Sequence, residues 1–201
     1  MFPYHLPATG RSSIRAGLRS LATLAAALVA ATTVRAQSAP QRAIALRFAA
    51  SVDSLPFACG TSYKNIGRTH ATITPSDLRL FVHDVRLIGE HGEEIPVQLQ
   101  SDSLWQSEGV ALLDFENGSG PCSNGNADVR DVVLGTAPAG NYRGVRFAVG
   151  VPFSLNHLDL TTQPSPLSLA RMFWAWNSGH KFLRVDMTTE GGERRGAPTD
   201  R

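Results

Sequence analysis

The chain has 201 residues, of which 19 are Lys or Arg and 17 are Asp or Glu, and 42% are hydrophobic. Residues 1–36 contain four of these arginines (positions 11, 15, 19 and 35) and no acidic residue, so the remainder has 15 basic and 17 acidic residues and a net charge of −2. This weakly acidic remainder lacks the basic footprint of a nucleic-acid-binding protein, and its length predicts one domain.

The first 36 residues have the pattern of a secretory leader. The apolar run "LRSLATLAAALVAA" follows a basic start, and small residues at Val34 and Ala36 close the segment. We therefore expect cleavage after Ala36 and export to the periplasm or the extracellular space. The apolar run is too short to span a bilayer stably, and no later stretch approaches spanning length. The rest divides into an expected domain at 37–188 and a polar tail at 189–201.

Short runs in which apolar and polar residues alternate recur along the expected domain. They occupy residues 43–50, 93–100, 142–153 and 180–187. Clusters of Gly, Pro, Asn and Asp separate them, which favours short antiparallel strands. The predicted fold class is all-β, an antiparallel β-sandwich with long loops. The one candidate for a short helix begins after Pro166.

The run "DLRLFVHDVRLI" changes the phase of its alternation. Leu80 and Val82 share one parity, whereas Val85 and Leu87 share the other. One extra residue near His83–Asp84 would keep all of these side chains on one face, as a β-bulge does. Bulges occur at functional rims, but they also simply terminate sheet edges, and the second interpretation is the simpler one.

Two cysteines, Cys59 and Cys122, lie in the part of the chain expected to be exported. Oxidising compartments permit disulfides, so a bridge between the two is the simplest interpretation. Thiolate ligands for a metal are the alternative.

Five histidines follow the leader, and none lies in a recognised metal-binding spacing. They are His70, His83, His91, His157 and His180. A sheet gathers ligands from separate strands, so linear spacing does not exclude a site. His157 has Asn156 and Asp159 nearby, which could orient its imidazole. For each histidine, a surface or hydrogen-bonded role is the simpler alternative.

The segment "LLDFENGSGPCSNGNAD" is rich in oxygen-bearing side chains. Such loops can bind calcium, although Asn-Gly and Gly-Ser pairs are also ordinary turn chemistry. We find no nucleophile elbow and no glycine-rich phosphate loop. The chain is therefore not expected to be an enzyme.

The segment "MFWAWNSGHKFLRVDM" places Trp174 and Trp176 two residues apart and just before His180. Tryptophans usually fill the core, and Trp105 is expected to be a packed strand residue. The sequence does not decide whether Trp174 and Trp176 lie on a strand, where they would share a face, or on a helix, where they would point apart.

Several segments together, in this order, resemble one family. They are "CGTSY", "DLRLFVHDVRL", "IPVQL", "DSLWQ", "LLDFENGSGPC", "YRGVRFAVGVPFSLNHLD" and "PLSLARMFWAWNSGHKFLRVD". The family is the MbnP-like proteins, also called the metallo-mystery-pair four-Cys motif family. The resemblance covers the expected domain up to about residue 187.

The resemblance implies an exported β-sandwich that binds copper. It implies a di-haem partner of the MauG and cytochrome c peroxidase type, which oxidises a tryptophan of the family member to kynurenine. The W-x-W segment matches Trp174 and Trp176. Imidazole suits copper and thioether sulfur suits its reduced ion, so His157 is the first ligand candidate, with His83, His180 and Met172 as weaker ones.

The chain departs from the family pattern in two places. Asn177 and His180 stand where the family commonly has Gln and Tyr, which makes His180 either an added ligand or a neutral exchange. The family continues with a further strand and another cysteine, whereas this chain ends in "TTEGGERRGAPTDR" and has two cysteines rather than four. A truncation or a frameshift of the C-terminal end is the expectation that this departure raises.

Two rival functions remain at this stage. The domain could recognise a glycan or a peptide, with Trp174 and Trp176 as a stacking platform. Alternatively, it could be a purely structural secreted domain with buried indoles and histidines that bind nothing.

Overall fold

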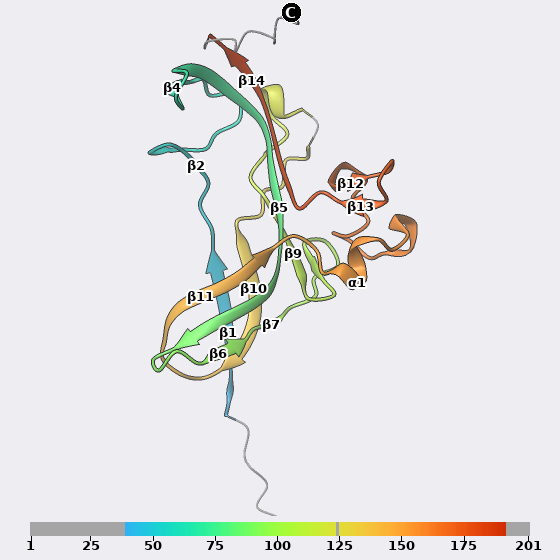
Figure 1. The fold of residues 1–201 in the computed structure, drawn as a ribbon. Helices are drawn as coiled ribbons and strands as arrows, with labels where there is room; N and C mark the ends of the chain where they lie inside the picture. The colour runs from blue at the N-terminus through green and yellow to red at the C-terminus, as the bar shows by residue number, and fades with distance from the viewer. Residues whose placement is uncertain (1–38, 124, 192–201) are drawn as a thin grey trace, which may run out of the picture. The chain divides into compact units, whose positions relative to one another are not determined.

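The computed structural model describes residues 39–123 and 125–191, which form β-strands joined by loops (Figure 1). The all-β prediction is confirmed. The expected leader and residues 192–201 of the expected tail lie outside the described residues. The last strand runs to Glu190, beyond the domain boundary expected at residue 188. Within the described ranges, no helix has the length and the apolar character needed to cross a bilayer.

Two antiparallel sheets carry the architecture. The smaller sheet has the strand order β1-β10-β7, with bounds β1 (Gln41–Arg47), β10 (Val132–Pro138) and β7 (Gln98–Leu99). The larger sheet is built on the long strand β5 (Ala71–Gly89). Its other members are β4 (Tyr63–Ile66), β6 (Glu94–Pro96), β8 (Gln106–Ser107), β9 (Val110–Asp114), β11 (Tyr142–Val149) and β14 (Leu183–Glu190).

Both edges of β5 are used along most of its length. Leu80 pairs with Leu183 of β14 and with Leu113 of β9, so these two strands lie on opposite edges. Further along β5, β11 replaces β14 opposite β9. One strand of 19 residues therefore aligns five others by backbone hydrogen bonding.

The predicted β-bulge is confirmed. Between the pairs Arg146–Arg86 and Ala148–His83, β5 contains one residue more than β11. Asp84 has a φ of 47°, in the left-handed region that Asp tolerates better than most residues. The bulge explains the change of phase in the sequence, because the extra residue keeps the apolar side chains on one face.

The smaller elements include the one described α-helix, α1 (Phe153–Asn156), and two short hairpins. The hairpins are formed by β2 (Ser51–Val52) with β3 (Leu55–Pro56), and by β12 (Phe173–Trp174) with β13 (Gly179–His180). Three single-turn 3-10 helices occupy Gly120–Cys122, Leu160–Thr162 and Ala170–Met172.

The short helix expected after Pro166 does not form. The backbone N–H groups of Leu167 and Ser168 both donate to the Pro164 carbonyl, and a 3-10 turn follows at Ala170–Met172. Leu167 and Met172 are both fully buried. Tight turns place both side chains in the core and leave Phe173 free to begin a strand, so the apolar spacing that suggests a helix is satisfied without one.

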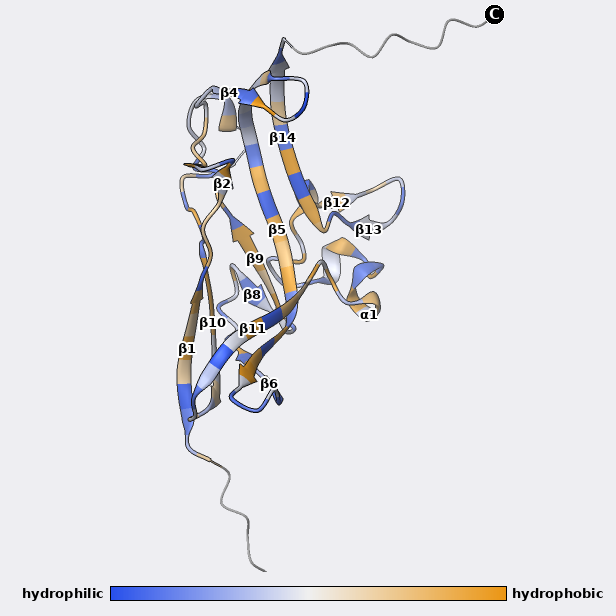
Figure 2. Ribbon diagram, turned by 60° about the vertical axis from the view of Figure 1, so that its left-hand side comes forward, coloured by the Kyte–Doolittle hydropathy of each residue, from blue (hydrophilic) through white to orange (hydrophobic). Residues whose placement is uncertain are grey.

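Two apolar clusters pack between the sheets. The first joins Val82, Ala111, Leu113 and Val133, and the second joins Val85, Leu87, Val97 and Ala137. Each cluster contains residues from both sheets, which is the packing expected of a sandwich. Figure 2 shows hydrophobic and hydrophilic bands alternating along β5 and β14, as the period of a half-buried strand requires.

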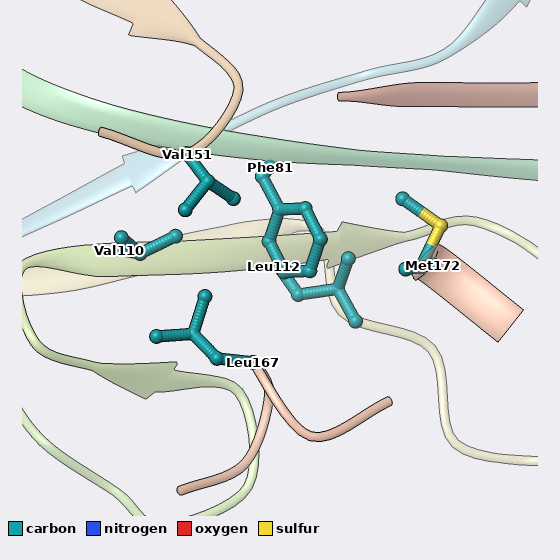
Figure 3. Packing of buried hydrophobic residues seen from close by; sticks show 6 residues of the cluster. All are labelled: Phe81, Val110, Leu112, Val151, Leu167 and Met172. Atoms are coloured by element: carbon teal, nitrogen blue, oxygen red, sulfur yellow. The ribbon is translucent and has the colours of Figure 1, made fainter. Parts of the chain in front are cut away.

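A third cluster covers the opposite face of the large sheet (Figure 3). Phe81 of β5 lies at its centre, next to Leu112 of β9. Val151, Leu167 and Met172 approach from the chain between β11 and β14. This cluster anchors the segment that contains α1 and the β12–β13 hairpin.

The alternating apolar residues of β11 and β14 are less buried than those of the inner strands. Val145 and Val149 of β11, and Leu183 and Val185 of β14, are all exposed. Both strands lie on the same outer edge of the large sheet, whereas the smaller sheet contributes only three strands. Alternation therefore identifies these strands correctly but does not tell how far each apolar face is covered.

A buried ionic network crosses the large sheet. The Arg79 guanidinium donates to Asp114 (Nε–Oδ2 2.9 Å), to Asp77 (Nη1–Oδ2 3.2 Å) and to Glu116. All four side chains are at most 3% exposed. Arg184 of β14 joins the network through its own ion pair with Asp77. Burial raises the pKa of Asp114 to about 6, because the loss of hydration outweighs the attraction of Arg79.

This raised pKa predicts a specific pH dependence of stability. Because folded Asp114 holds its proton more tightly than the unfolded chain does, its contribution is fully present below its ordinary pKa of 3.8 and is lost as the pH rises to about 6. We expect Asp114→Asn, which is uncharged throughout, to lack this component. Urea unfolding of both proteins between these pH values should show a difference that changes by about 1–3 kcal/mol. Parallel pH profiles would contradict the assignment.

Candidate functional site

The W-x-W segment forms the β12–β13 hairpin. Phe173 pairs with His180, and Trp174 pairs with Gly179. The Asn177 N–H donates to the Trp174 carbonyl at 3.0 Å and closes the turn. Trp174 is therefore a strand residue and Trp176 a turn residue, which resolves the strand-or-helix alternative that the sequence leaves open.

Both indoles of this hairpin are accessible to solvent. Trp174 is 43% exposed and Trp176 is 79% exposed. Their ring centroids are 5.7 Å apart, and the ring planes are inclined at 60°. The usual expectation that tryptophan fills the core is wrong for this pair. Trp105 packs against a core cluster as expected, but it lies in the bend before β8 and not in a strand.

Lys181, which follows the hairpin, covers one of the indoles. Its Nζ lies 4.3 Å from the centroid of the Trp174 ring, a cation–π contact. The same Nζ donates to the Arg171 carbonyl at 3.1 Å, and the Lys181 backbone N–H donates to the Met172 carbonyl at 2.8 Å. No sequence pattern singles out Lys181, because its side chain reaches Trp174 only after the hairpin has folded.

His157, the first ligand candidate, lies against the hairpin turn. Its Nδ1 is 2.7 Å from the Ser178 carbonyl, and its Nε2 is 3.1 Å from the Asn156 amide nitrogen. A carbonyl only accepts and an amide nitrogen only donates, so these partners fix the neutral tautomer with a proton on Nδ1. Nε2 then carries the lone pair, which accepts the hydrogen bond from the Asn156 amide, and the side chain is exposed. A neutral imidazole can ligate a metal through such a lone pair, and here the metal would displace the Asn156 amide.

Gly179 permits the close approach of His157. A Cβ atom at this position would lie 3.2 Å from Cε1 of His157 and 3.4 Å from the Asn156 amide nitrogen. Asn156 indeed contacts His157, as the sequence suggests, whereas Asp159 caps the following turn by accepting from the Thr161 N–H.

His180 is buried and fully engaged. Its Nδ1 is 3.0 Å from the Asn156 carbonyl and its Nε2 is 2.9 Å from the Leu167 carbonyl. The ring also meets Phe81 and Phe173 edge to face. A metal could bind His180 only by displacing one of these carbonyl oxygens, so the geometry describes a residue that holds α1, the 164–169 turns and the hairpin together.

The other two weaker ligand candidates, His83 and Met172, lie apart from the tryptophan turn. His83 lies beside the bulge of β5, with its Nδ1 2.9 Å from the Gly150 carbonyl. Met172 is fully buried in the cluster around Phe81, where its thioether packs against apolar side chains. Among the described residues, no three His, Cys, Asp or Glu side chains gather closely enough to hold a metal ion. Of the candidate donors, His157 alone is exposed and hydrogen-bonded to the turn of the tryptophan hairpin.

The oxygen-rich segment has a structural task. Asp114 and Glu116 bind Arg79, and Glu116 also accepts from the N–H groups of Gly118 and Asn126. Asp114 and Glu116 are thus used within the fold, so two of the three carboxylates that the calcium alternative relies on are already bound. The segment also contains Cys122, and the predicted disulfide between Cys59 and Cys122 is confirmed.

A cavity of about 330 Å³ lies between the Arg79 network and the turns at 164–169. Trp105, Asp114, Leu169 and Arg171 are among its lining residues. None of the predicted copper ligands lines it. The cavity therefore does not bear on the tryptophan and histidine site.

Comparison with known proteins gives one family. The MbnP family model matches residues 41–195, which is most of the chain. The chain belongs to the MbnP family. The match extends past residue 187, where the resemblance in the sequence ends, and includes the whole of β14.

A solved structure supports the assignment. MbnP from Methylosinus trichosporium is 27% identical in sequence, with a TM-score of 0.61. The superposition covers 74% of this chain and 55% of that chain, so this chain spans about half the length of its structural relative. Comparison with curated proteins gives no match.

The two histidines near the hairpin should differ in their contribution to stability. We expect His180→Ala to lower the free energy of unfolding by roughly 2–3 kcal/mol, because it removes a buried ring that packs on Phe81 and Phe173 and leaves one buried carbonyl group without its donor. The same substitution at the exposed His157 should lower the free energy of unfolding by less than about 1 kcal/mol. Urea unfolding at one pH measures both variants, and equal losses would contradict the division of roles.

Proposed function

We propose that this MbnP-family protein is an exported copper-binding protein and the substrate of a di-haem partner that oxidises Trp174 or Trp176 to kynurenine. The observation that carries the proposal is the position of an exposed tryptophan pair on a hairpin whose turn is hydrogen-bonded to the exposed imidazole of His157. In this proposal the protein does not catalyse the oxidation.

Exposure of the tryptophan pair supports oxidation by another protein. A partner's haem must come within electron-transfer distance of the indole, and a solvent-facing turn permits that approach. Conversion of tryptophan to kynurenine removes one carbon from the side chain and adds one oxygen. The product carries an aryl amine and a ketone where the indole had only an N–H donor, so the oxidation creates potential ligand atoms.

The imidazole of His157 supports copper as the ion. Nitrogen donors of this kind suit copper in both common oxidation states. The Ser178 carbonyl would act as the orienting partner, because it accepts from Nδ1–H of His157 at 2.7 Å, whereas the Asn156 amide bonds to Nε2 and would give way to the ion. His83 is the next candidate ligand. His180 ranks below it, since its ring nitrogens already have carbonyl partners.

The disulfide supports an exported location. Disulfides persist in oxidising compartments such as the periplasm and the extracellular space. A periplasmic or secreted location is also where a di-haem protein of the MauG and cytochrome c peroxidase type would meet the hairpin.

Copper binding can be tested by titration of the purified protein after co-expression with the di-haem partner. We expect one stoichiometric site that is weakened by about 100-fold or more in His157→Ala. His91→Ala is the matched control, because His91 lies in an exposed turn. The proposal fails if His157→Ala binds copper as tightly as the parent does.

The modification can be tested by mass spectrometry of the same preparation. The peptide that covers residues 172–187 should gain one oxygen and lose one carbon when the active partner is present, and should keep its mass when the partner lacks its haem-binding cysteines. Trp174→Phe and Trp176→Phe identify the modified ring. An unmodified peptide in the presence of active partner would refute this part of the proposal.

A ligand-binding module is the second candidate, and the exposure of both indoles favours it. Stacking platforms for sugars or peptide rings use exposed aromatic faces. The planes of Trp174 and Trp176 are inclined at 60°, however, so the two rings do not form one flat surface. Quenching of tryptophan fluorescence by candidate glycans, with Trp176→Phe as the comparison, separates this function from copper binding.

A further inference from the structure

We propose that Lys181 directs one-electron oxidation within the tryptophan pair to Trp176 by disfavouring a positive charge on Trp174. This inference deepens the proposed function by naming the residue that selects the oxidised ring. It concerns the order in which the two indoles lose an electron, so it can be tested without the di-haem partner and without copper.

The two indoles have different electrostatic surroundings. The ammonium of Lys181 lies 4.3 Å from the centroid of Trp174, whereas Trp176 projects from the turn and is 79% exposed. Water surrounds most of Trp176 and can stabilise a charge that appears on it. Trp174 faces a fixed cation.

The position of Lys181 is held by the fold. Its Nζ donates to the Arg171 carbonyl, and its backbone N–H donates to the Met172 carbonyl. A side chain anchored at both ends of its stem keeps its charge near the ring instead of sampling solvent.

Neighbouring charges do not cancel the ammonium. The groove beside Trp174 is lined by Lys181, Arg184 and Asp186. Arg184 binds Asp186 and also Asp77, so each of these two carboxylates already has a cationic partner. Lys181 therefore adds a net positive charge at the face of Trp174.

A cation at this position affects the neutral and the oxidised ring in opposite ways. It is attracted to the electron-rich face of a neutral indole. Removal of one electron makes the ring cationic, and the attraction becomes a repulsion between like charges. The cation thus stabilises Trp174 before oxidation and destabilises it afterwards, and both effects make the electron harder to remove.

Because the two rings are close together, the site of oxidation can move to the ring on which the radical is more stable. With centroids 5.7 Å apart, an electron can pass from Trp176 to an oxidised Trp174 before slower chemistry begins. In the net step, Trp176 gives one electron to the oxidant, which is reduced by one electron. The indole N–H of Trp176 then releases its proton to water and leaves a neutral tryptophanyl radical.

The test uses photogenerated ruthenium(III) polypyridyl, a one-electron oxidant, followed by peptide mapping of the oxidation products. For the parent protein we expect products at Trp176 to exceed those at Trp174 by about tenfold, since a like charge at this distance opposes oxidation by roughly fivefold in bulk water and by more beside a protein surface. Lys181→Met should bring the ratio toward parity. Lys181→Arg, which restores the charge, should restore the preference.

The control is Lys64→Met, which removes an exposed lysine of β4 and should leave the ratio unchanged. Exposure alone would also favour Trp176, so the comparison is repeated in a Trp176→Phe background. There, Lys181→Met should speed the oxidation of Trp174 by about tenfold. Trp174 fluorescence and circular dichroism establish that the hairpin is retained.

The inference is overturned if parent and Lys181→Met give the same product ratio, or if Lys181→Met leaves the rate of Trp174 oxidation unchanged in the Trp176→Phe background. The two proposals can fail separately. If the ruthenium oxidant shows a preference for Trp176 that depends on Lys181, but the di-haem protein modifies neither tryptophan, the proposed function is overturned and this inference stands.

Discussion

The rest of the structure depends on the buried guanidinium of Arg79. A charge removed from water is tolerated only when it is paired and hydrogen-bonded, and Arg79 meets three carboxylates from β5, β9 and the segment after β9. These elements must therefore assemble together. Glu116 extends the constraint by binding the N–H groups of Gly118 and Asn126, and the disulfide of Cys122 with Cys59 ties the same segment to the chain before β4.

The site is linked to this network through β5. Phe81, two residues after Arg79 and on the same face of the strand, centres the cluster that anchors the chain between β11 and β14. Its ring also meets His180, which bonds to the Asn156 and Leu167 carbonyls. The hairpin is thus fixed at its base while its turn faces solvent. The proposed oxidation needs both properties, because an external oxidant would have to reach a ring whose surroundings are set by the fold.

Side chains of similar chemistry have different roles within this small region. His180 is a packed residue between two carbonyl groups, whereas His157 lies at the surface and its Nε2 accepts from the Asn156 amide. Trp174 lies under the ammonium of Lys181, whereas Trp176 is surrounded by solvent. In each case the difference arises from neighbours supplied by another segment of the chain. The protein belongs to the MbnP family, and these local differences are the basis for assigning the proposed copper binding to His157 and the proposed oxidation to Trp176.

The sequence alone determined the all-β class and the bulge near His83–Asp84, because alternation is a local property of the chain. It made the disulfide the simplest interpretation, since only two cysteines follow the leader, and the fold confirmed it by bringing Cys59 and Cys122 together. It also placed Asn156 beside His157, since adjacent residues remain close in any fold. Tertiary structure alone decided that the tryptophan pair is exposed, that the segment after Pro166 forms turns instead of a helix, and that Lys181 reaches Trp174. Those outcomes depend on how distant segments pair and which faces they cover, and no residue spacing specifies that.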